Sequence, residues 1–242
     1  MTHYIDQNRK AYDAIAEDFA LSRDVRYGEL PLLLPFVKPG DVILDLGCGT
    51  GRVYQFLKEN QWIGSGASDA QVSYIGVDQS EGQLAEARKR FSNGDFRVGS
   101  LNEIPLNDVS VDTIFCIATF HHLPDRDTRL ESLKEMRKVL KTGGRVLMSN
   151  WNLINDHVVD TYHVTRSTYQ KIVEGEPLIV PWKHKDGYVV AERWYWYISP
   201  GQTENLAKDA GFELSEWFYT KEDQKETDPK IGMNMVSILL KA

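Results

Sequence analysis

The chain has 242 residues, of which 42% are hydrophobic and 26% are charged, and its formal net charge at pH 7 is −7. This composition is typical of a globular protein with one large α/β domain, and it argues against a surface that coats nucleic acid, although a local basic patch stays compatible with it. The sequence contains no run of about 18 apolar residues and no apolar secretory segment at its start, so we expect neither a membrane span nor export.

The number and spacing of the cysteines bear on the redox compartment and on metal binding. Cys48 and Cys116 are the two cysteines, and they form neither a disulfide framework nor a metal-ligand spacing. Two isolated thiols are typical of a protein in a reducing compartment. We therefore expect a cytoplasmic protein without a metal site.

The first part of the chain predicts an entry segment and then alternating strands and helices. Residues 6–20 carry Tyr12, Ile15, Ala16 and Phe19 at helical spacing, which predicts a helix within an N-terminal segment over 1–35. A polar, glycine-rich stretch at 64–70 predicts a loop, and the glycines of 141–144 predict a turn. Strands are expected at 41–47, 72–78, 95–100, 111–119 and 145–151, and helices at 53–60, 81–90 and 125–140.

The rest of the chain has a different pattern. A short helix over 201–210 precedes two apolar segments, 212–220 and 233–242, which are typical of paired strands. Between the two halves, residues 152–198 form an aromatic-rich insertion that we interpret as a lid over the sheet edge. Altogether the sequence predicts a single domain over 1–242, with a doubly wound, mostly parallel seven-stranded sheet.

The segment "LDLGCGTGR", residues 44–52, joins an apolar strand to a helical stretch through Gly47, Gly49 and Gly51. Nicotinamide-binding turns follow G-x-G-x-x-G instead, with an acidic residue about 20 positions later. Here Asp45 precedes the glycines, where its charge would repel a pyrophosphate and attract a cationic amino group. The pattern predicts S-adenosylmethionine as the cofactor, and a turn that only packs a helix on a strand is the alternative.

The ends of the other strands extend this prediction, because a doubly wound sheet binds ligands beyond the carboxyl ends of its strands. Asp78 ends the second strand, and its carboxylate has the lone pairs to accept both ribose hydroxyls of the cofactor. Glycines at 49 and 51 let the backbone approach the ligand closely. The expected cofactor-binding residues are Asp45, Gly47, Cys48, Gly49, Gly51, Asp78, Gln79, Ser100, Leu101 and Ala118.

The same residues carry a family resemblance. The segments "LDLGCGTGR", "IGVDQS" and "TFHHLPDRDTRLESLKEMRKVLKTGGRVLMSNW" resemble the class I methyltransferases over residues 40–151. Within that group the chain resembles the tRNA wobble-uridine carboxymethyl methyltransferases, on "YDAIAEDFALSR", "VPWKHKDG" and "RWYWYISPGQTENLAKDAGF". The resemblance implies methyl transfer to a carboxylate of a modified tRNA, and it implies a small zinc-binding activator protein as a partner.

The chain departs from that narrower family at three places. Ser100 stands where the family usually has an aspartate that holds the adenine amino group, and it offers an uncharged acceptor instead. Tyr27 and Gly28 replace an expected Trp-Pro pair, and Trp196 replaces a histidine. These departures concern the substrate rather than the fold.

The candidate catalytic residues follow from the chemistry of the acceptor. A carboxylate is already ionised at pH 7 and needs cations to hold it, for which arginine has bidentate geometry. Arg23 and Arg193 are the candidates for this contact, with surface arginines as the alternative. His121 and His122 follow the fourth strand and serve as a base for another substrate or as a hydrogen-bonded wall.

Aromatic and basic residues complete the set of candidates. Trp151 ends the fifth strand and lines the substrate cavity or the core, while Trp182 and Tyr195 stack a base or fill the lid. A basic helix face, which is either a contact for tRNA or a solvated surface, comprises Arg126, Arg129, Lys134, Arg137, Lys138 and Lys141. Two other functions stay open, a small-molecule methyltransferase and a non-catalytic subunit that binds the cofactor.

Overall fold

A computed structural model describes residues 2–22, 28–64 and 71–242. Arg23, the Tyr27 position and most of the predicted glycine-rich loop at 64–70 lie outside the described residues. No helix in the described ranges is long and apolar enough to cross a bilayer.

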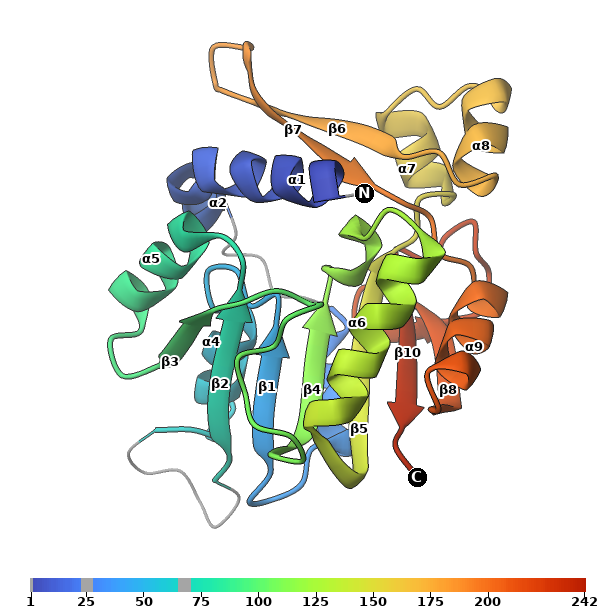
Figure 1. Cartoon of the computed structure of the whole chain (residues 1–242). Coiled ribbons are helices and arrows are strands. Elements are labelled where there is room, and N and C mark those ends of the chain that lie inside the picture. Colours follow the sequence, from blue (N-terminus) through green and yellow to red (C-terminus); the bar gives the residue numbers. More distant parts are fainter. Residues whose placement is uncertain (1, 23–27, 65–70) are drawn as a thin grey trace.

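The central sheet has eight strands within the described residues, in the order β3-β2-β1-β4-β5-β10-β8-β9 (Figure 1). Five of them run parallel, namely β1 (Val42–Leu46), β2 (Ser73–Asp78), β3 (Asp95–Val98), β4 (Val111–Ile117) and β5 (Leu140–Trp151). The other three are antiparallel to their neighbours, namely β8 (Glu213–Lys221), β9 (Gln224–Glu226) and β10 (Asn234–Leu240). The predicted doubly wound, mostly parallel sheet is therefore confirmed.

Two details of the sheet differ from the predictions. The predicted count of seven strands is corrected to eight, because the polar strand β9 has only 3 residues and no apolar alternation to reveal it. Strand β5 begins at Leu140, so residues 141–144 belong to it rather than to a separate turn. The pairing with β4 shifts register at this point, and Gly143 takes a φ of +75° there.

Helices cover both faces of the sheet. On one face, α6 (Arg126–Val139) and α9 (Pro200–Asp209) pack in a cluster that contains Met148. On the other face, α3 (Leu30–Leu33), α4 (Arg52–Glu59) and α5 (Glu81–Arg90) contribute to a cluster that contains Leu147. Because successive side chains of a strand point to opposite faces, neighbours in β5 belong to different clusters.

Side-chain caps define where three of these helices begin. Ser80 accepts a hydrogen bond from the Gln83 N–H at 3.1 Å and so caps α5. Asp125 caps α6 in the same way, and Ser199 forms a capping box with Gln202 ahead of α9. Each cap satisfies N–H groups that have no partner inside the helix. The cap on α5 matters for the site below, because it fixes the loop that follows β2.

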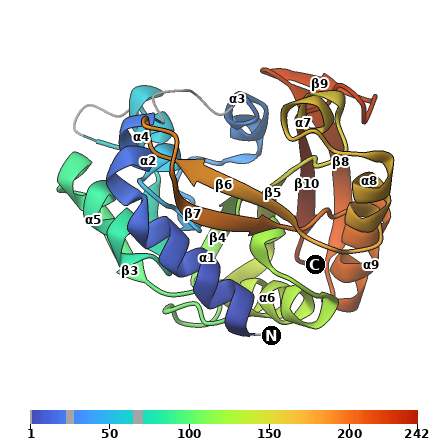
Figure 2. The ribbon, with the colours of Figure 1, turned by 90° about the horizontal axis from the view of Figure 1, so that it is seen from above.

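A second layer lies above the carboxyl ends of the parallel strands (Figures 1 and 2). Helix α1 (Thr2–Ala14) crosses this edge and α2 (Ala16–Ser22) follows it, so the predicted single helix over 6–20 is divided at Ile15. The predicted lid comprises α7 (Asp156–Thr161), α8 (Arg166–Val173) and a hairpin of β6 (Leu178–Lys183) with β7 (Val189–Tyr195). The lid has a small apolar core of its own, which contains Leu153, Val158, Ile172, Leu178, Val180 and Tyr195.

Candidate functional site

The glycine turn between β1 and α4 is held by backbone geometry that only glycine adopts easily. Gly47 has a φ of +81°, and a Cβ on it would come within 2.3 Å of the Thr119 side chain. Gly49 has a φ of +51°, yet an added Cβ would meet nothing closer than Gln83 Oε1 at 3.7 Å. The first glycine therefore serves packing, whereas the second leaves the backbone open toward the cavity.

Asp78 ties this turn to the next strand. One carboxylate oxygen accepts the Gly49 N–H at 2.8 Å, and the other accepts the Ser80 N–H at 2.9 Å. Burial raises the pKa of Asp78, and the hydrogen bonds from Ser80 and Gly49 oppose that effect. The side chain thus lies at the end of β2 with both oxygens oriented by backbone donors.

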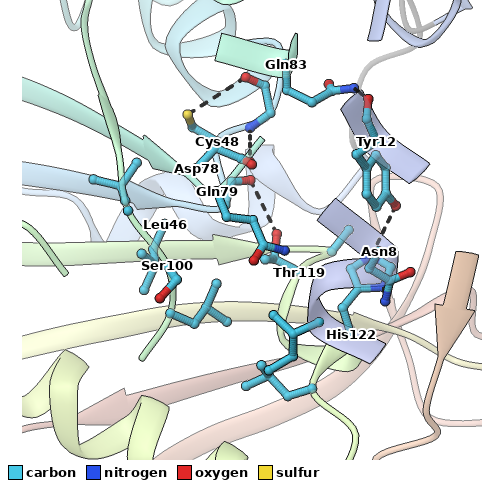
Figure 3. Close-up of a pocket in the computed structure, with 18 of the residues that line it drawn as sticks. Asn8, Tyr12, Leu46, Cys48, Asp78, Gln79, Gln83, Ser100, Thr119 and His122 are labelled. Atoms are coloured by element: carbon cyan, nitrogen blue, oxygen red, sulfur yellow. Dashed lines mark hydrogen bonds between the residues drawn. The ribbon is translucent and has the colours of Figure 1, made fainter. Parts of the chain in front are cut away.

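A cavity of about 430 Å³ lies beyond the carboxyl ends of β1, β2 and β4, under α1 (Figure 3). Its volume is in the range of small-molecule sites in proteins. Eight of the ten expected cofactor-binding residues line it, namely Gly47, Cys48, Gly49, Asp78, Gln79, Ser100, Leu101 and Ala118. Gly51 lies outside the lining, where an added Cβ would meet Phe91 at 3.0 Å.

Asp45 also lies outside the lining, behind the turn. Its side chain is 1% exposed and accepts a hydrogen bond from the Tyr74 hydroxyl at 2.6 Å. Burial and the charge of Asp78 raise the pKa of Asp45 to about 7, although the Tyr74 hydrogen bond opposes this. The expected direct contact between Asp45 and a cationic amino group is therefore corrected, because Asp45 supports the turn from within the core.

An orphaned acceptor in the cavity suits that amino group better. Gln83 donates from Nε2 to the Tyr12 carbonyl at 3.0 Å, while its buried Oε1 has no hydrogen-bond partner among the described residues. Gln83 lines the cavity beside Gly49. A buried acceptor without a partner is costly unless a ligand satisfies it. The acceptors in the cavity thus fit the hydroxyl and amino groups of an S-adenosylmethionine molecule. In the sequence, Gln83 is marked only by its position three residues after Ser80, the cap of α5.

The other end of the cavity is formed by α1 and the segment after β4 (Figure 3). His122 lines it, with Nδ1 2.8 Å from the Trp194 carbonyl oxygen and Nε2 3.0 Å from the Tyr12 hydroxyl. The Tyr12 hydroxyl is also 3.1 Å from that of Tyr195. Burial lowers the pKa of His122 to about 4, with the Trp194 carbonyl opposing and the charge of Arg193 adding to the effect. His122 is therefore neutral at pH 7.

His121 occupies a different place. Its Nδ1 accepts the Trp151 N–H at 2.9 Å, and its carbonyl accepts the Trp196 N–H at 2.9 Å. The side chain is 1% exposed, does not line the cavity, and has a pKa lowered by burial. Trp151 is also absent from the cavity lining, and it contacts Tyr162 and Tyr195 edge-on. Neither His121 nor Trp151 therefore lines the cavity.

Arg193 is a buried cation on β7. Its side chain is 6% exposed, and its guanidinium lies 5.1 Å from the Trp182 ring centre and 5.7 Å from that of Tyr195. No carboxylate pairs with it among the described residues, and its Nε has no hydrogen-bond partner there. Burial opposes its charge, yet interactions with Tyr195 and Tyr12 leave the pKa of Arg193 raised. The structure thus holds a permanent positive charge beside Tyr12.

The aromatic and basic residues expected at a nucleic-acid contact have partners within the protein to different degrees. Tyr195 is 5% exposed and so has no free face for a base, whereas Trp182 is partly exposed, with Phe19 tilted against it and the Arg193 guanidinium over its ring. Five of the six cations of the predicted basic face have partners within the described residues: Arg126 pairs with Asp209, Arg129 donates to the Leu123 carbonyl, Arg137 to that of Gly211, Lys138 pairs with Asp108 and Lys141 with Asp112. Lys134 is exposed. Three cations of this face thus have acidic partners at the surface, whereas Arg129 and Arg137 bond neutral carbonyls and keep their charge.

Comparisons with known proteins agree with this geometry. A family model described as a methyltransferase domain matches residues 37–196. A methyltransferase of Encephalitozoon cuniculi is 33% identical over 141 residues, which cover 58% of this chain and 60% of that protein. The tRNA (carboxymethyluridine(34)-5-O)-methyltransferase of Arabidopsis thaliana is 28% identical over 142 residues, 59% of this chain and 32% of its own length. The alignments thus span less than two thirds of these curated relatives.

Solved structures share the fold. A methyltransferase of Haloferax volcanii, in complex with its Trm112 activator, superposes with a TM-score of 0.66 at 18% sequence identity, over 97% of both chains. At 18% sequence identity this superposition supports a shared fold and nothing more specific.

Proposed function

The chain belongs to the class I methyltransferases, whose domain matches residues 37–196, and from this premise we propose that it methylates a carboxylate of a modified wobble uridine in tRNA. The observation that carries the proposal is the buried guanidinium of Arg193, which lies outside the cavity lining beside Tyr12 and has no acid partner among the described residues. A desolvated cation without a counter-ion is unfavourable until an anion binds beside it. A substrate carboxylate supplies that anion.

The cofactor end of the site is assigned to residues of the glycine turn and its neighbours. Asp78 would accept hydrogen bonds from the ribose hydroxyls, and Gln83 Oε1 would accept one from the ammonium group. Ser100 would lie at the adenine. When bound, S-adenosylmethionine supplies a methyl group activated by a positively charged sulfur.

The protein's own contribution to transfer is position and exclusion of water. Helix α1 covers the cavity, and Arg193 would orient the two carboxylate oxygens so that one faces the methyl group. Orientation of two reactants in a dry site accounts for several kcal/mol of a barrier. A carboxylate is ionised at neutral pH, so this reaction needs no base. Arg23 remains the second candidate for the anion contact.

A partner belongs to the same proposal. The Haloferax volcanii structure contains a Trm112 activator bound to a methyltransferase of this fold. We include an activator of that kind, expected to bind zinc, as a partner of this chain.

A small-molecule methyltransferase is the second candidate function. Its support is specific: Arg126, Lys138 and Lys141 of the basic face pair with acidic side chains of the same chain, and the net charge of the chain is −7. Such a surface favours a compact substrate over a long polyanion.

Nucleoside analysis distinguishes the two. Digested tRNA from cells that lack the gene should accumulate carboxymethyluridine and lose its methyl ester, as measured by mass spectrometry, and wild-type protein should restore the ester. An unchanged nucleoside profile, together with a metabolite that loses its methyl group, supports the small-molecule function instead.

A further inference from the structure

A tight turn over residues 100–103 follows β3 and forms one end of the cavity, where Ser100 is labelled in Figure 3. The Ser100 N–H donates to the Glu103 carbonyl at 3.1 Å, and the Glu103 N–H donates to the Ser100 carbonyl at 3.3 Å. These two bonds make an isolated antiparallel bridge, which leaves Leu101 and Asn102 at the tip of the turn. Both of these residues line the cavity, so the bridge fixes the part of the turn that a ligand meets.

The side-chain amide of Asn102 has a fixed orientation. Its Nδ2 donates to the Thr128 carbonyl at 2.9 Å. Because a carbonyl only accepts hydrogen bonds, the amide nitrogen rather than the amide oxygen faces Thr128. Thr128 is itself held at the start of α6, since its N–H donates to Asp125 Oδ1 at 2.9 Å. Asn102 Oδ1 accepts no hydrogen bond from the described residues, so this end of the cavity has one oriented acceptor.

The surface around this acceptor is mostly apolar. Leu101 and Leu123 are 9% and 4% exposed, belong to one apolar cluster with Ile5, and line the cavity together with it. Asp127 and Glu131 on α6 also line the cavity, but both are exposed. Water competes for the hydrogen bonds of an exposed carboxylate, so these two acids discriminate weakly between ligands. An apolar surface with one oriented acceptor suits a flat heteroaromatic ring that carries an amino group.

The adenine of the cofactor is such a ring. Asp78 is assigned to the ribose and Gln83 to the ammonium group, and the Gly99 N–H donates to the Asp78 carbonyl at 3.0 Å. The turn therefore begins directly beside the ribose position. Adenine has a donor at C6, its amino group, whereas a 6-oxo purine has an acceptor there. The Ser100 hydroxyl both donates and accepts, so it can bond either purine, but the Asn102 oxygen only accepts.

We propose that Asn102 Oδ1 accepts a hydrogen bond from the adenine amino group of S-adenosylmethionine, and that this contact makes the site selective for a 6-amino over a 6-oxo purine. Asn102 is thus a specificity-determining residue for the cofactor, at a position that the sequence pattern does not mark. The inference concerns the cofactor alone and is independent of the methyl acceptor, whether that acceptor is a tRNA or a small molecule.

Binding calorimetry tests this assignment without any methyl transfer. The two ligands are S-adenosylhomocysteine and S-inosylhomocysteine, which has an oxygen in place of the amino group. Wild type should bind the adenosyl ligand at least about tenfold more tightly, because the inosine oxygen would face the Asn102 oxygen and leave two acceptors unpaired. Equal affinities of wild type for the two ligands overturn the proposal.

Variants of the turn then locate the selectivity. Asn102→Leu removes the acceptor and should bring the two affinities within about threefold of each other, chiefly by weakening the adenosyl ligand. Asn102→Asp loses the bond to the Thr128 carbonyl but keeps an acceptor, so the ratio of the two affinities should stay near that of wild type. Ser100→Ala should keep this ratio as well. Asn93→Leu, at an exposed asparagine before β3, is the matched control.

The ratio of affinities separates recognition from support of the fold. If Asn102 only holds the turn against α6, Asn102→Leu weakens both ligands equally and the ratio stays unchanged, which contradicts the proposal. A ratio that collapses in Ser100→Ala, or in Asn102→Asp, contradicts it too. The wild-type and Ser100→Ala measurements decide the matter even where Asn102→Leu does not fold. Since no methyl acceptor is present, failure here leaves the wobble-uridine proposal untouched.

Discussion

Asp45 carries a carboxylate in the core, hydrogen-bonded to Tyr74 and close to Asp78. Burial raises its pKa to about 7, whereas an aspartate in an unfolded chain titrates near 3.9. The folded state thus keeps a proton that the unfolded state releases. Compared with a neutral side chain at this position, Asp45 therefore lowers the free energy of unfolding progressively as the pH rises from about 4 through about 7.

The prediction for Asp45→Asn follows from that sign. Asparagine keeps an acceptor for Tyr74 and carries no charge, so the variant should have a higher Tm than wild type at pH 8. The gain should shrink at pH 5, where the wild-type carboxyl is protonated in the folded state. Thermal denaturation at both pH values measures it, and a gain of equal size at pH 5 and pH 8 would contradict the assignment.

Asp78 tests the cofactor end of the site. Asp78→Ala removes a charged acceptor for two hydroxyl groups, and a hydrogen bond to a charged group contributes about 1.5–3 kcal/mol. We expect S-adenosylmethionine to bind ten- to a hundredfold more weakly, as measured by calorimetry. Asp95→Ala, on the exposed end of β3, is the control. Unchanged affinity in folded Asp78→Ala protein rules out the ribose contact.

At the scale of elements, helix α1 is held over the cavity from both ends. Asn8 joins it to β7 through both backbone groups of Trp194, and Asp13 accepts hydrogen bonds from Ser80 and Gly82 at the start of α5. Neither contact is visible in helical periodicity, because the partners lie 186 and 67 residues apart in sequence. The hydrophobic pattern thus predicts that a helix forms but not what it covers.

Asn8→Ala tests this attachment. The change removes the side-chain acceptor of the Trp194 N–H and one of the partners of the Trp194 carbonyl, which keeps its contact with His122. Loss of the partner of a buried group costs about 1–3 kcal/mol. We expect a lower Tm and faster hydrogen exchange in α1 and β7, with exchange in β4 unchanged. Asn60→Ala, an exposed amide that donates to the Phe56 carbonyl, should have little effect. Uniform acceleration over the whole chain would show that Asn8 supports global stability instead.

At the scale of the whole molecule, the sequence predicts the parallel half of the fold well and the site in part. Apolar runs that end in Gly47, Asp78 and Ala118 mark successive strand ends, and the sheet topology brings those ends together at one cavity. Asn8, Tyr12 and Gln83 were missed as site residues, because their roles depend on how α1 lies across the sheet. The predicted basic face shows the reverse case, since the acidic partners that Arg126 and Lys141 have in the fold cannot be read from the spacing of the basic residues.

The carboxylate proposal rests on Arg193, which is 6% exposed and has no acid partner in the described part of the chain. Loss of a desolvated arginine–carboxylate contact on truncation costs about 2–5 kcal/mol. Arg193→Ala should therefore impair transfer far more than cofactor binding. Arg166→Ala, an exposed arginine of the lid, is the matched control.

The most direct measurement is transfer of a labelled methyl group by purified protein, with and without an activator, to tRNA that contains carboxymethyluridine. Wild type and Arg166→Ala should label this tRNA, and Arg193→Ala should label it at least about a hundredfold more slowly. Its affinity for S-adenosylmethionine should stay within a few-fold of wild type. If wild-type protein labels a metabolite extract but never tRNA under either condition, the wobble-uridine function is wrong.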